Sequence, residues 1–431
     1  MKRIILSLTA GVLLLVPATA QQKIWTLQDC LDYALENNIQ LRQSRNTYLS
    51  GLEDTAEARA ALFPTLSASA SQNIGLNPFT DNDKTAYSGS YGINSELTLF
   101  SGGRLRNNIR LQEVQNTRDS LSVEASAMDI RIAIVQAYMQ CLYAAEAVTV
   151  NESTVEASQA QRDRAEQMWK AGSISKVDFA QLESQLSGDQ YQLTASRVTL
   201  DNYRLQLKQL LELGIDEEMT LAGAGADDDE VLRLLPDKHE VYANALETMP
   251  EIASSQLAVD AAKLSEKVAK AGYLPTVGLS AGIGTSNRYG AGNTFTSQIQ
   301  DNLGVNAGLT VSIPIFTGRK NKTAVNKARI ALVNSRLDSI SVEKSVLKEV
   351  ETVYLDAVSA QSQYVAAQEK EKYARQSYEL TDEQFRLGMK NTVELITAKN
   401  DLLSAQQSRL QAKYMALLNR QILDIYQGTQ S

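Results

Sequence analysis

One series of short motifs occurs twice along this 431-residue chain, and this duplication constrains the fold more than any other feature. Phe-Pro-Thr at residues 63–65 returns as Leu-Pro-Thr at 274–276, which is 211 residues later. Phe-Ser-Gly at 100–102 returns as Phe-Thr-Gly at 316–318, which is 216 residues later. Two constant spacings separated by one five-residue insertion indicate a tandem duplication of a unit of about 200 residues.

Residues 1–20 have the layout of a secretory signal peptide. Lys2 and Arg3 precede an apolar run at 4–16, and Ala-Thr-Ala at 18–20 fits a small-residue cleavage site. The alternative is a membrane anchor, but the apolar run is too short to cross a bilayer comfortably. We therefore expect an exported protein whose mature chain starts at Gln21.

The duplication predicts a first repeat at 21–213 and a second repeat at 237–431, joined by an acidic linker or equatorial region at 214–236. Four consecutive acidic residues at 227–230 follow a Gly-Ala stretch. Packed like charges repel one another unless a cation is present, and the glycines indicate flexibility. We interpret this stretch as solvated linker rather than as a metal site.

Composition argues against several classes of function. The net charge of −8 speaks against nucleic acid as a partner. The single histidine, His239, excludes a histidine-rich metal site within one chain, and the sequence offers no nucleophile–base–acid set, so we expect no cofactor and no catalytic residue. The two cysteines, Cys30 and Cys141, are interpreted as small buried thiols, with a disulfide as the alternative.

Most of each repeat is predicted to be long helix. No proline occurs between Pro78 and Pro236 or after Pro314, and both stretches are rich in strong helix formers. Residues 105–170 alone could form a helix of roughly 100 Å, which must pack along other helices. A seven-residue apolar repeat, typical of a left-handed supercoil, occurs at Leu186, Leu193, Leu200 and Leu207 and again at Ile396, Leu403, Leu410 and Leu417.

Between the helical stretches, apolar and polar residues alternate with a period of two, which predicts β-strands. Each repeat offers two strands joined by a polar loop, at about 64–72 and 87–100 and at about 275–285 and 303–315, so each forms a β-hairpin. The predicted apolar face carries Tyr87, Tyr91, Ile93, Leu97 and Leu99 in the first repeat, and Leu303, Val305, Leu309, Val311, Ile313 and Ile315 in the second.

Such strands fit either a soluble sandwich or an outer-membrane barrel, in which the apolar side faces lipid. The signal peptide and strand lengths of about 9–14 residues favour the barrel. Lipid tolerates no open strand edge, so four strands must be completed by other chains. Two chains would give a barrel filled by side chains and three would give twelve strands with a lumen, whereas the residues alone do not choose between three and four.

The order of these features resembles the TolC-like outer-membrane efflux proteins. The resemblance rests on the duplicated helix–hairpin–helix plan, the Phe-Pro-Thr and Leu-Pro-Thr strand entries, and the strand exits Leu-Phe-Ser-Gly-Gly-Arg at 99–104 and Ile-Phe-Thr-Gly-Arg at 315–319. Helix-hairpin tips at 171–178 and 387–394 complete it, and it covers essentially the whole mature chain.

The resemblance implies a mainly α fold with a β-barrel part: a long α-helical coiled-coil tube in the periplasm and a twelve-stranded transmembrane barrel shared by three chains. It also implies an outer-membrane channel of a tripartite efflux or secretion system. Such a channel is a passive exit duct and no enzyme. Its expected partners are two further copies, outer-membrane lipid, a periplasmic adaptor (membrane fusion protein) and an inner-membrane transporter.

The two tips are the most informative functional segments. Glycine supplies the left-handed turn at a helix end, and Ser175 or Thr392 can cap the following helix. Ordinary hairpin turns would explain these residues, whereas the resemblance implies that an adaptor docks there. The docking candidates are Gly172, Ser173, Ser175, Gly388, Met389 and Thr392.

Four residues near the tips are candidates for a gate: Asp178, Lys390, Glu394 and Thr397. Acidic residues early in a helix are favoured by the helix dipole, which is the simpler explanation of both carboxylates. The resemblance implies that Glu394 rings a closed entrance and attracts cations. Thr397 stands where the family has a second acidic ring, so the gate is expected to be less acidic, and Lys390 is expected to pair with neighbouring helices.

Two rival functions remain. A periplasmic coiled-coil adaptor or scaffold without a barrel would explain the helices and the signal peptide, but it has no need of amphipathic hairpins. A diffusion porin would use the barrel but not such long helices.

Overall fold

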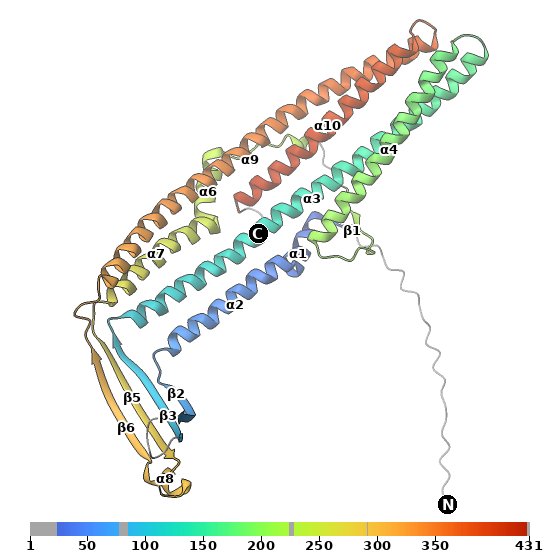
Figure 1. The fold of residues 1–431 in the computed structure, drawn as a ribbon. Helices are drawn as coiled ribbons and strands as arrows, with labels where there is room; N and C mark the ends of the chain where they lie inside the picture. Colours follow the sequence, from blue (N-terminus) through green and yellow to red (C-terminus); the bar gives the residue numbers. More distant parts are fainter. Residues whose placement is uncertain (1–23, 77–84, 224–227, 291, 429–431) are drawn as a thin grey trace, which may run out of the picture.

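The computed structural model describes residues 24–76, 85–223, 228–290 and 292–428. They form an elongated molecule with long helices at one end and a β-sheet at the other (Figure 1). Among the described residues, no helix is both long and apolar enough to cross a membrane. The predicted signal peptide lies outside the described residues.

The same series of elements occurs twice. The first series is α1 (Leu27–Asn37), α2 (Ile39–Ala60), β2 (Thr65–Leu76), β3 (Thr85–Ser101), α3 (Arg104–Lys170) and α4 (Lys176–Leu210). The second is α6 (Lys238–Thr248), α7 (Pro250–Ala271), β5 (Thr276–Arg288), α8 (Phe295–Asp301), β6 (Gly304–Ser312), α9 (Lys320–Arg386) and α10 (Thr392–Tyr426). Matching helices have equal lengths of 11, 22, 67 and 35 residues, which confirms the duplicated plan.

The region between the two series is more ordered than the flexible linker that we expected. Within it, β4 (Thr220–Leu221) pairs in parallel with β1 (Ile24–Trp25), and α5 (Asp228–Val231) follows. Val231 is buried, and the side-chain amide of Gln361 on α9 donates to the carbonyls of Val231 and Arg233 at 3.0 and 2.9 Å. This part therefore folds against the long helices, while 224–227 lie outside the described residues.

The helices form two antiparallel pairs, α3 with α4 and α9 with α10. The predicted seven-residue repeats lie in their packed seams: Leu207 is fully buried, and Leu200 and Leu417 are nearly so. Fully burying one such side chain contributes about 1.5–3 kcal/mol. The apolar stripes predicted from the sequence are therefore the surfaces along which α3 packs on α4 and α9 packs on α10.

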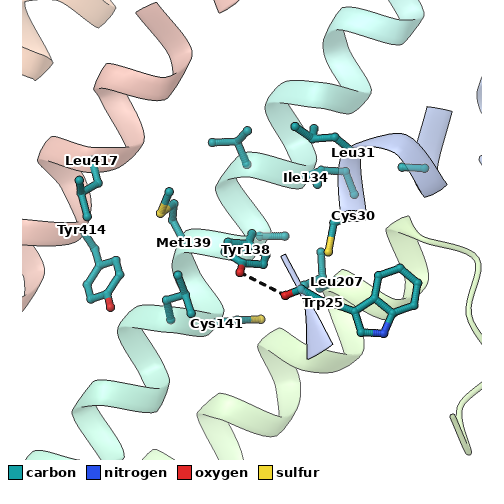
Figure 2. Packing of buried hydrophobic residues seen from close by; sticks show 14 of the residues in the cluster. Trp25, Cys30, Leu31, Ile134, Tyr138, Met139, Cys141, Leu207, Tyr414 and Leu417 are labelled. Atoms are coloured by element: carbon teal, nitrogen blue, oxygen red, sulfur yellow. Dashed lines mark hydrogen bonds between the residues drawn. The ribbon is translucent and has the colours of Figure 1, made fainter. Parts of the chain in front are cut away.

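The largest buried cluster lies midway along the helices, where α1 and β1 meet α3 (Figure 2). Tyr138 anchors it, because its hydroxyl donates to the carbonyls of Ala222 at 2.9 Å and Trp25 at 3.3 Å. Cys30 and Cys141 lie in this cluster as buried thiols, as predicted, and no disulfide forms. Burial raises the pKa of Cys141 to about 12.

The sheet is antiparallel with the order β2-β3-β5-β6. Ile93 pairs with Ala68 on one side and with Ile283 on the other, and Ile283 pairs with Val305. Directly paired residues point to the same face, so this register places the apolar residues of all four strands on one face of the sheet. That face carries Leu66, Ala68, Ala70, Ile74, Tyr87, Tyr91, Ile93, Leu97, Val277, Leu279, Ile283, Val305, Leu309 and Val311.

Three details of the predicted hairpins were wrong. The register steps from Thr98 to Phe100, which makes Leu99 the extra residue of a β-bulge and brings Phe100 opposite Val277 on the apolar face. Ile313 and Ile315 lie beyond the end of β6, and Leu303 lies just before its start. The β5–β6 connection contains α8, whose cap Thr294 accepts from the backbone N–H of Ser297 at 3.3 Å, rather than a simple polar loop.

The helices next to the sheet follow the order of the strands. Helix α2 packs on α3, α3 on α7, and α7 on α9. Each of these helices is joined to one strand, so the four helices form a wall in the order α2-α3-α7-α9. Helices α2 and α9 lie at its two sides, as β2 and β6 lie at the two edges of the sheet (Figure 1).

Candidate functional site

The tips of both helical hairpins meet at the end of the molecule away from the sheet (Figure 1). They share a small core formed by Ala165, Phe179, Leu182, Phe385 and Leu395, which come from all four long helices. Trp169 of α3 stacks on Phe179 of α4, with ring centroids 5.3 Å apart. The two predicted tips are therefore one structural unit.

The first tip is closed as predicted. Gly172 adopts the left-handed conformation with φ +78°, and the N–H of Ser173 donates to the carbonyl of Met168 at 2.8 Å. Ser175 caps α4: its hydroxyl accepts from the N–H of Asp178 at 3.1 Å, and the Asp178 carboxylate accepts from the N–H of Ser175 at 3.2 Å. Gly172, Ser173 and Ser175 are exposed.

The second tip has the same geometry, but its cap is Asn391 and not Thr392. The Asn391 side chain accepts from the N–H of Glu394 at 2.9 Å, and the Glu394 carboxylate accepts from the N–H of Asn391 at 3.1 Å. The prediction for Thr392 was wrong because Asn391 with Glu394 three residues later forms the complete capping box, a signal present in the sequence. Thr392 is instead 1% exposed, so it offers no docking surface, whereas Gly388 and Met389 are exposed.

Local contacts hold the two tip carboxylates in their charged form. The hydrogen bond from Lys390, 2.5 Å away, and then the N–H of Asn391 lower the pKa of Glu394. Within this chain, Lys390 thus pairs with its own helical turn rather than with a neighbouring helix. The Ser175 hydroxyl lowers the pKa of Asp178, and the Thr392 hydroxyl adds to this effect across the tips.

Thr397 is exposed on the next turn of α10. Its hydroxyl donates to the carbonyl of Val393 at 2.8 Å. A threonine side chain is uncharged, so Thr397 adds no charge to that of Glu394.

A buried polar cluster that sequence analysis missed joins the two hairpins below the tips. Lys399 of α10 forms an ion pair with Asp189 of α4 and a hydrogen bond with Ser158 of α3. The side chains of Lys399 and Asp189 are only 4% and 7% exposed. Asp189 lies seven residues after the buried Leu182, so a charge at a core position of the repeat was the signal that could have revealed the cluster.

Two further contacts connect α3 with α9. The Gln161 amide donates to the hydroxyl of Tyr378 at 2.8 Å, and Arg164 lies 3.4 Å from Asp382. Burial raises the pKa of Tyr378, so its hydroxyl keeps its proton. These bridges fix the second hairpin against the first.

The site contains polar and charged groups that can attract, repel or bind a partner. In the described part of the chain, no group of three or more His, Cys, Asp or Glu side chains is placed to hold a metal ion. The arrangement is that of a helical end with exposed turns and partly exposed carboxylates.

Comparison with known proteins assigns the class. The model of the family described as outer membrane efflux protein matches residues 30–212 and 241–429. The outer membrane efflux protein BepC of Brucella suis biovar 1 is 25% identical over 395 residues, which cover 90% of this chain and 82% of that protein. The alkaline protease secretion protein AprF of Pseudomonas aeruginosa is 23% identical, covering 93% of this chain and 84% of that protein.

Solved structures show the same fold. A crystal structure of CusC superposes with a TM-score of 0.81 over 95% of both chains, at 19% sequence identity. The long helices and the sheet of this chain are therefore arranged as in that structure.

This chain belongs to the outer membrane efflux protein family. It is a TolC-like channel protein of the outer membrane, and the family is one of transport ducts rather than enzymes. The alternative of a periplasmic adaptor or scaffold without a barrel is thereby set aside.

Proposed function

We propose that three copies of this chain form one channel, the passive exit duct of a tripartite efflux or secretion system. Twelve strands would form its barrel in the outer membrane, and the helices would form a tube in the periplasm. A periplasmic adaptor and an inner-membrane transporter would deliver the cargo. BepC and AprF are named for efflux and for protease secretion, so relatives support both kinds of cargo.

The observation that carries this proposal is a sheet that is incomplete in one chain. No residue of its four strands belongs to a buried hydrophobic cluster of the described residues. Strands β2 and β6 are its open edges. Each unpaired backbone group would cost several kcal/mol in lipid, so strands of other copies must close the sheet.

The two faces of the sheet indicate their surroundings. The apolar face fits lipid, and its proposed lipid contacts include Tyr87, Tyr91, Ile93, Leu97, Val305, Leu309 and Val311. The opposite face carries Asn94, Glu96, Ser280, Asn306 and Thr310, which fit a water-filled lumen. A lumen requires more than the eight strands of a dimer.

The helical wall has matching open sides. Helix α9 exposes Ile330, Val333, Leu337 and Ile340 at the alternating spacing of three and four residues that is typical of a coiled-coil seam. On the opposite side, α2 exposes Leu49 and Leu52. Two different surfaces on opposite sides favour a head-to-tail contact that closes into a ring.

At the tips, the exposed turns Gly172, Ser173, Ser175, Gly388 and Met389 are proposed to meet the adaptor. A ring of three copies would gather three Glu394 carboxylates at the entrance, together with Asp178, Lys390 and Thr397. Such a ring would attract cations and repel anions.

A cysteine pair tests the ring. Leu49 lies eleven residues before the end of α2 and Ile330 ten residues after the start of α9. Both therefore lie about 15 Å from the sheet end of their helices at about 1.5 Å per residue. The double variant L49C/I330C should crosslink on oxidation into species of two and three chains, with nothing larger.

The matched control is L49C/L355C, because Leu355 is also exposed on α9 but lies 35 residues from its start. This control should stay monomeric on a denaturing gel. Equal crosslinking of both variants, or products that stop at two chains, would contradict the proposed trimer.

A further inference from the structure

The junction between the helices and the sheet is strongly basic, although the chain as a whole is acidic. Residues 57–63, 101–113, 260–274 and 316–329 carry twelve Lys and Arg but only four Asp and Glu, in a chain of net charge −8. We name these twelve cations the basic collar: Arg59, Arg104, Arg106, Arg110, Lys263, Lys267, Lys270, Arg319, Lys320, Lys322, Lys327 and Arg329.

Most of the collar has no counter-charge in the described chain. Its ion pairs there involve only Arg59, Lys263, Lys270 and Arg329, and these engage three of the four local carboxylates. The other eight cations are exposed and make no ion pair with a described residue. Clustered like charges repel one another, so the chain alone leaves a strong positive potential at this level.

The starts of α3 and α9 add to this potential. Neither helix has an acidic residue in its first turn, and neither start is capped by a side-chain hydrogen bond. Bases such as Arg104 and Lys320 stand where the helix dipole favours acids. The positive potential of this surface therefore favours binding of an anion from outside the chain.

Aromatic side chains lie between the collar and the sheet. Each of the four helix–strand junctions exposes one: Phe63 at 69%, Phe100 at 48%, Tyr273 at 50% and Phe316 at 89%. Three of the seven phenylalanines of the chain are thus placed here. Aromatic rings at such a level mark the boundary between acyl chains and headgroups.

The opposite end of the sheet differs. In the described residues 288–303, which join β5 to β6, there is one base, Arg288, and one acid, Asp301. The described part of this end therefore carries no excess of positive charge, in contrast to the helical end.

We propose that the basic collar binds the anionic headgroups of phospholipids in the membrane leaflet next to the helices. The proposal rests on the placement of the sheet in lipid under the proposed function. With the apolar face among acyl chains and the aromatic residues at the boundary, the collar lies at the depth of the lipid phosphates. Juxtamembrane cations attract anionic lipid in this way, and the attraction is screened by salt.

The test uses the purified full-length chain in detergent micelles doped with phosphatidylglycerol or with phosphatidylcholine. Lipid retained after gel filtration is counted by native mass spectrometry. The collar variant is R104Q/R106Q/R110Q/K320Q/K322Q/K327Q. The matched control removes six exposed cations far from the sheet: K170Q/K176Q/K344Q/K348Q/K370Q/K372Q.

The unchanged protein and the control should retain phosphatidylglycerol in preference to phosphatidylcholine. The collar variant should retain at least about tenfold less phosphatidylglycerol, since several cations act together. Salt at high concentration should weaken the retention in the unchanged protein. Equal retention by collar variant and control, or equal retention of both lipids by the unchanged protein, would overturn the proposal.

Two further measurements keep the outcome clear. Displacement of phosphatidylglycerol by millimolar inorganic phosphate would identify a site for free phosphate and overturn the lipid assignment. The L49C/I330C crosslink, repeated in the collar background, reports assembly separately, so a failure of the trimer is not confused with a failure of lipid binding. If the sixfold variant does not assemble, K320Q/K322Q/K327Q replaces it, with an expected loss of at least about threefold.

Discussion

The helical part of this chain buries apolar side chains, whereas the sheet exposes side chains that are equally apolar. Leu207, Leu395 and Leu423 on the helices are fully buried, whereas Leu309 and Val305 on the sheet are 63% and 80% exposed. The helices build their core within one chain, because the duplication supplies two hairpins that pack together, although the outer sides of α2 and α9 stay open. The strands find only each other, and both outer strands keep an open edge.

This difference teaches that one folded chain can build its own core in one region and have none in another. The helical part has the buried core and the internal polar bridges of a protein in water, and neighbouring chains are needed there to cover the open sides of α2 and α9. The sheet is stable only if lipid and neighbouring chains supply what is missing. Substitutions in the helical part should therefore act by disturbing its core, and substitutions in the sheet by disturbing its contact with lipid or with neighbouring chains.

The largest expected effect comes from the buried bridge in the helical part. Lys399→Met should destabilise this part by about 3–5 kcal/mol, because Asp189 would be left buried without its counter-charge. Thermal unfolding, followed by helical circular dichroism in detergent, measures the loss.

The matched control is the double variant Lys399→Met with Asp189→Leu, which removes both charges and should recover most of the stability. If the single variant loses less than about 1 kcal/mol, the pair is not buried in the assembled protein and this view of the helical part is wrong.

The next effect concerns the sheet. Leu309→Arg places a charge on the face proposed to meet lipid and should lower the stability of the membrane-inserted barrel by about 2–4 kcal/mol. The adjacent Thr310→Arg points to the opposite face, so it should leave assembly intact and change the ion selectivity of the pore. The amount of protein in the outer-membrane fraction and single-channel recordings measure the two outcomes. Similar loss of membrane protein for both variants would mean that the two faces are not distinct.

The sequence predicted the helical part better than the sheet, for physical reasons. Leu186, Leu193, Leu200 and Leu207 repeat every seven residues, and a regular helix converts that spacing directly into one packed stripe. On the strands, one extra residue reverses the alternation, so the bulge at Leu99 moved Phe100 to the apolar face without any change in composition.

The candidate site was predicted in part. The glycine turns and the Ser175 cap follow from local sequence, because each involves residues within a few positions of one another. The contact of Lys399 with Asp189 could not be derived in the same way, because 210 residues separate the partners and only the packing of two hairpins brings them together.

The smallest expected effect concerns the entrance. Glu394→Ala should weaken block by divalent or trivalent cations in single-channel recordings, and Lys390→Ala should strengthen it, because Lys390 offsets the Glu394 charge. Asn391→Ala is the control for loss of a helix cap, since it breaks the same capping box without removing a charge. Unchanged block in Glu394→Ala would remove this residue from the gate.

The pH dependence of block sharpens this test. The pKa of Glu394 is lowered first by Lys390, so its charge and the block should persist below the ordinary carboxylate range and disappear only as the pH falls through the lowered pKa. In Lys390→Ala, the pKa should rise toward its ordinary value, so the block should be lost at a higher pH. The same midpoint in both proteins would show that the pair does not control the entrance.

The central claim is that one chain cannot close its own sheet. The most direct measurement is the native mass of the purified full-length protein in detergent. The proposed trimer should give three times the mass of one chain and no stable smaller species. A monodisperse single chain that stays folded in buffer without detergent would contradict the claim.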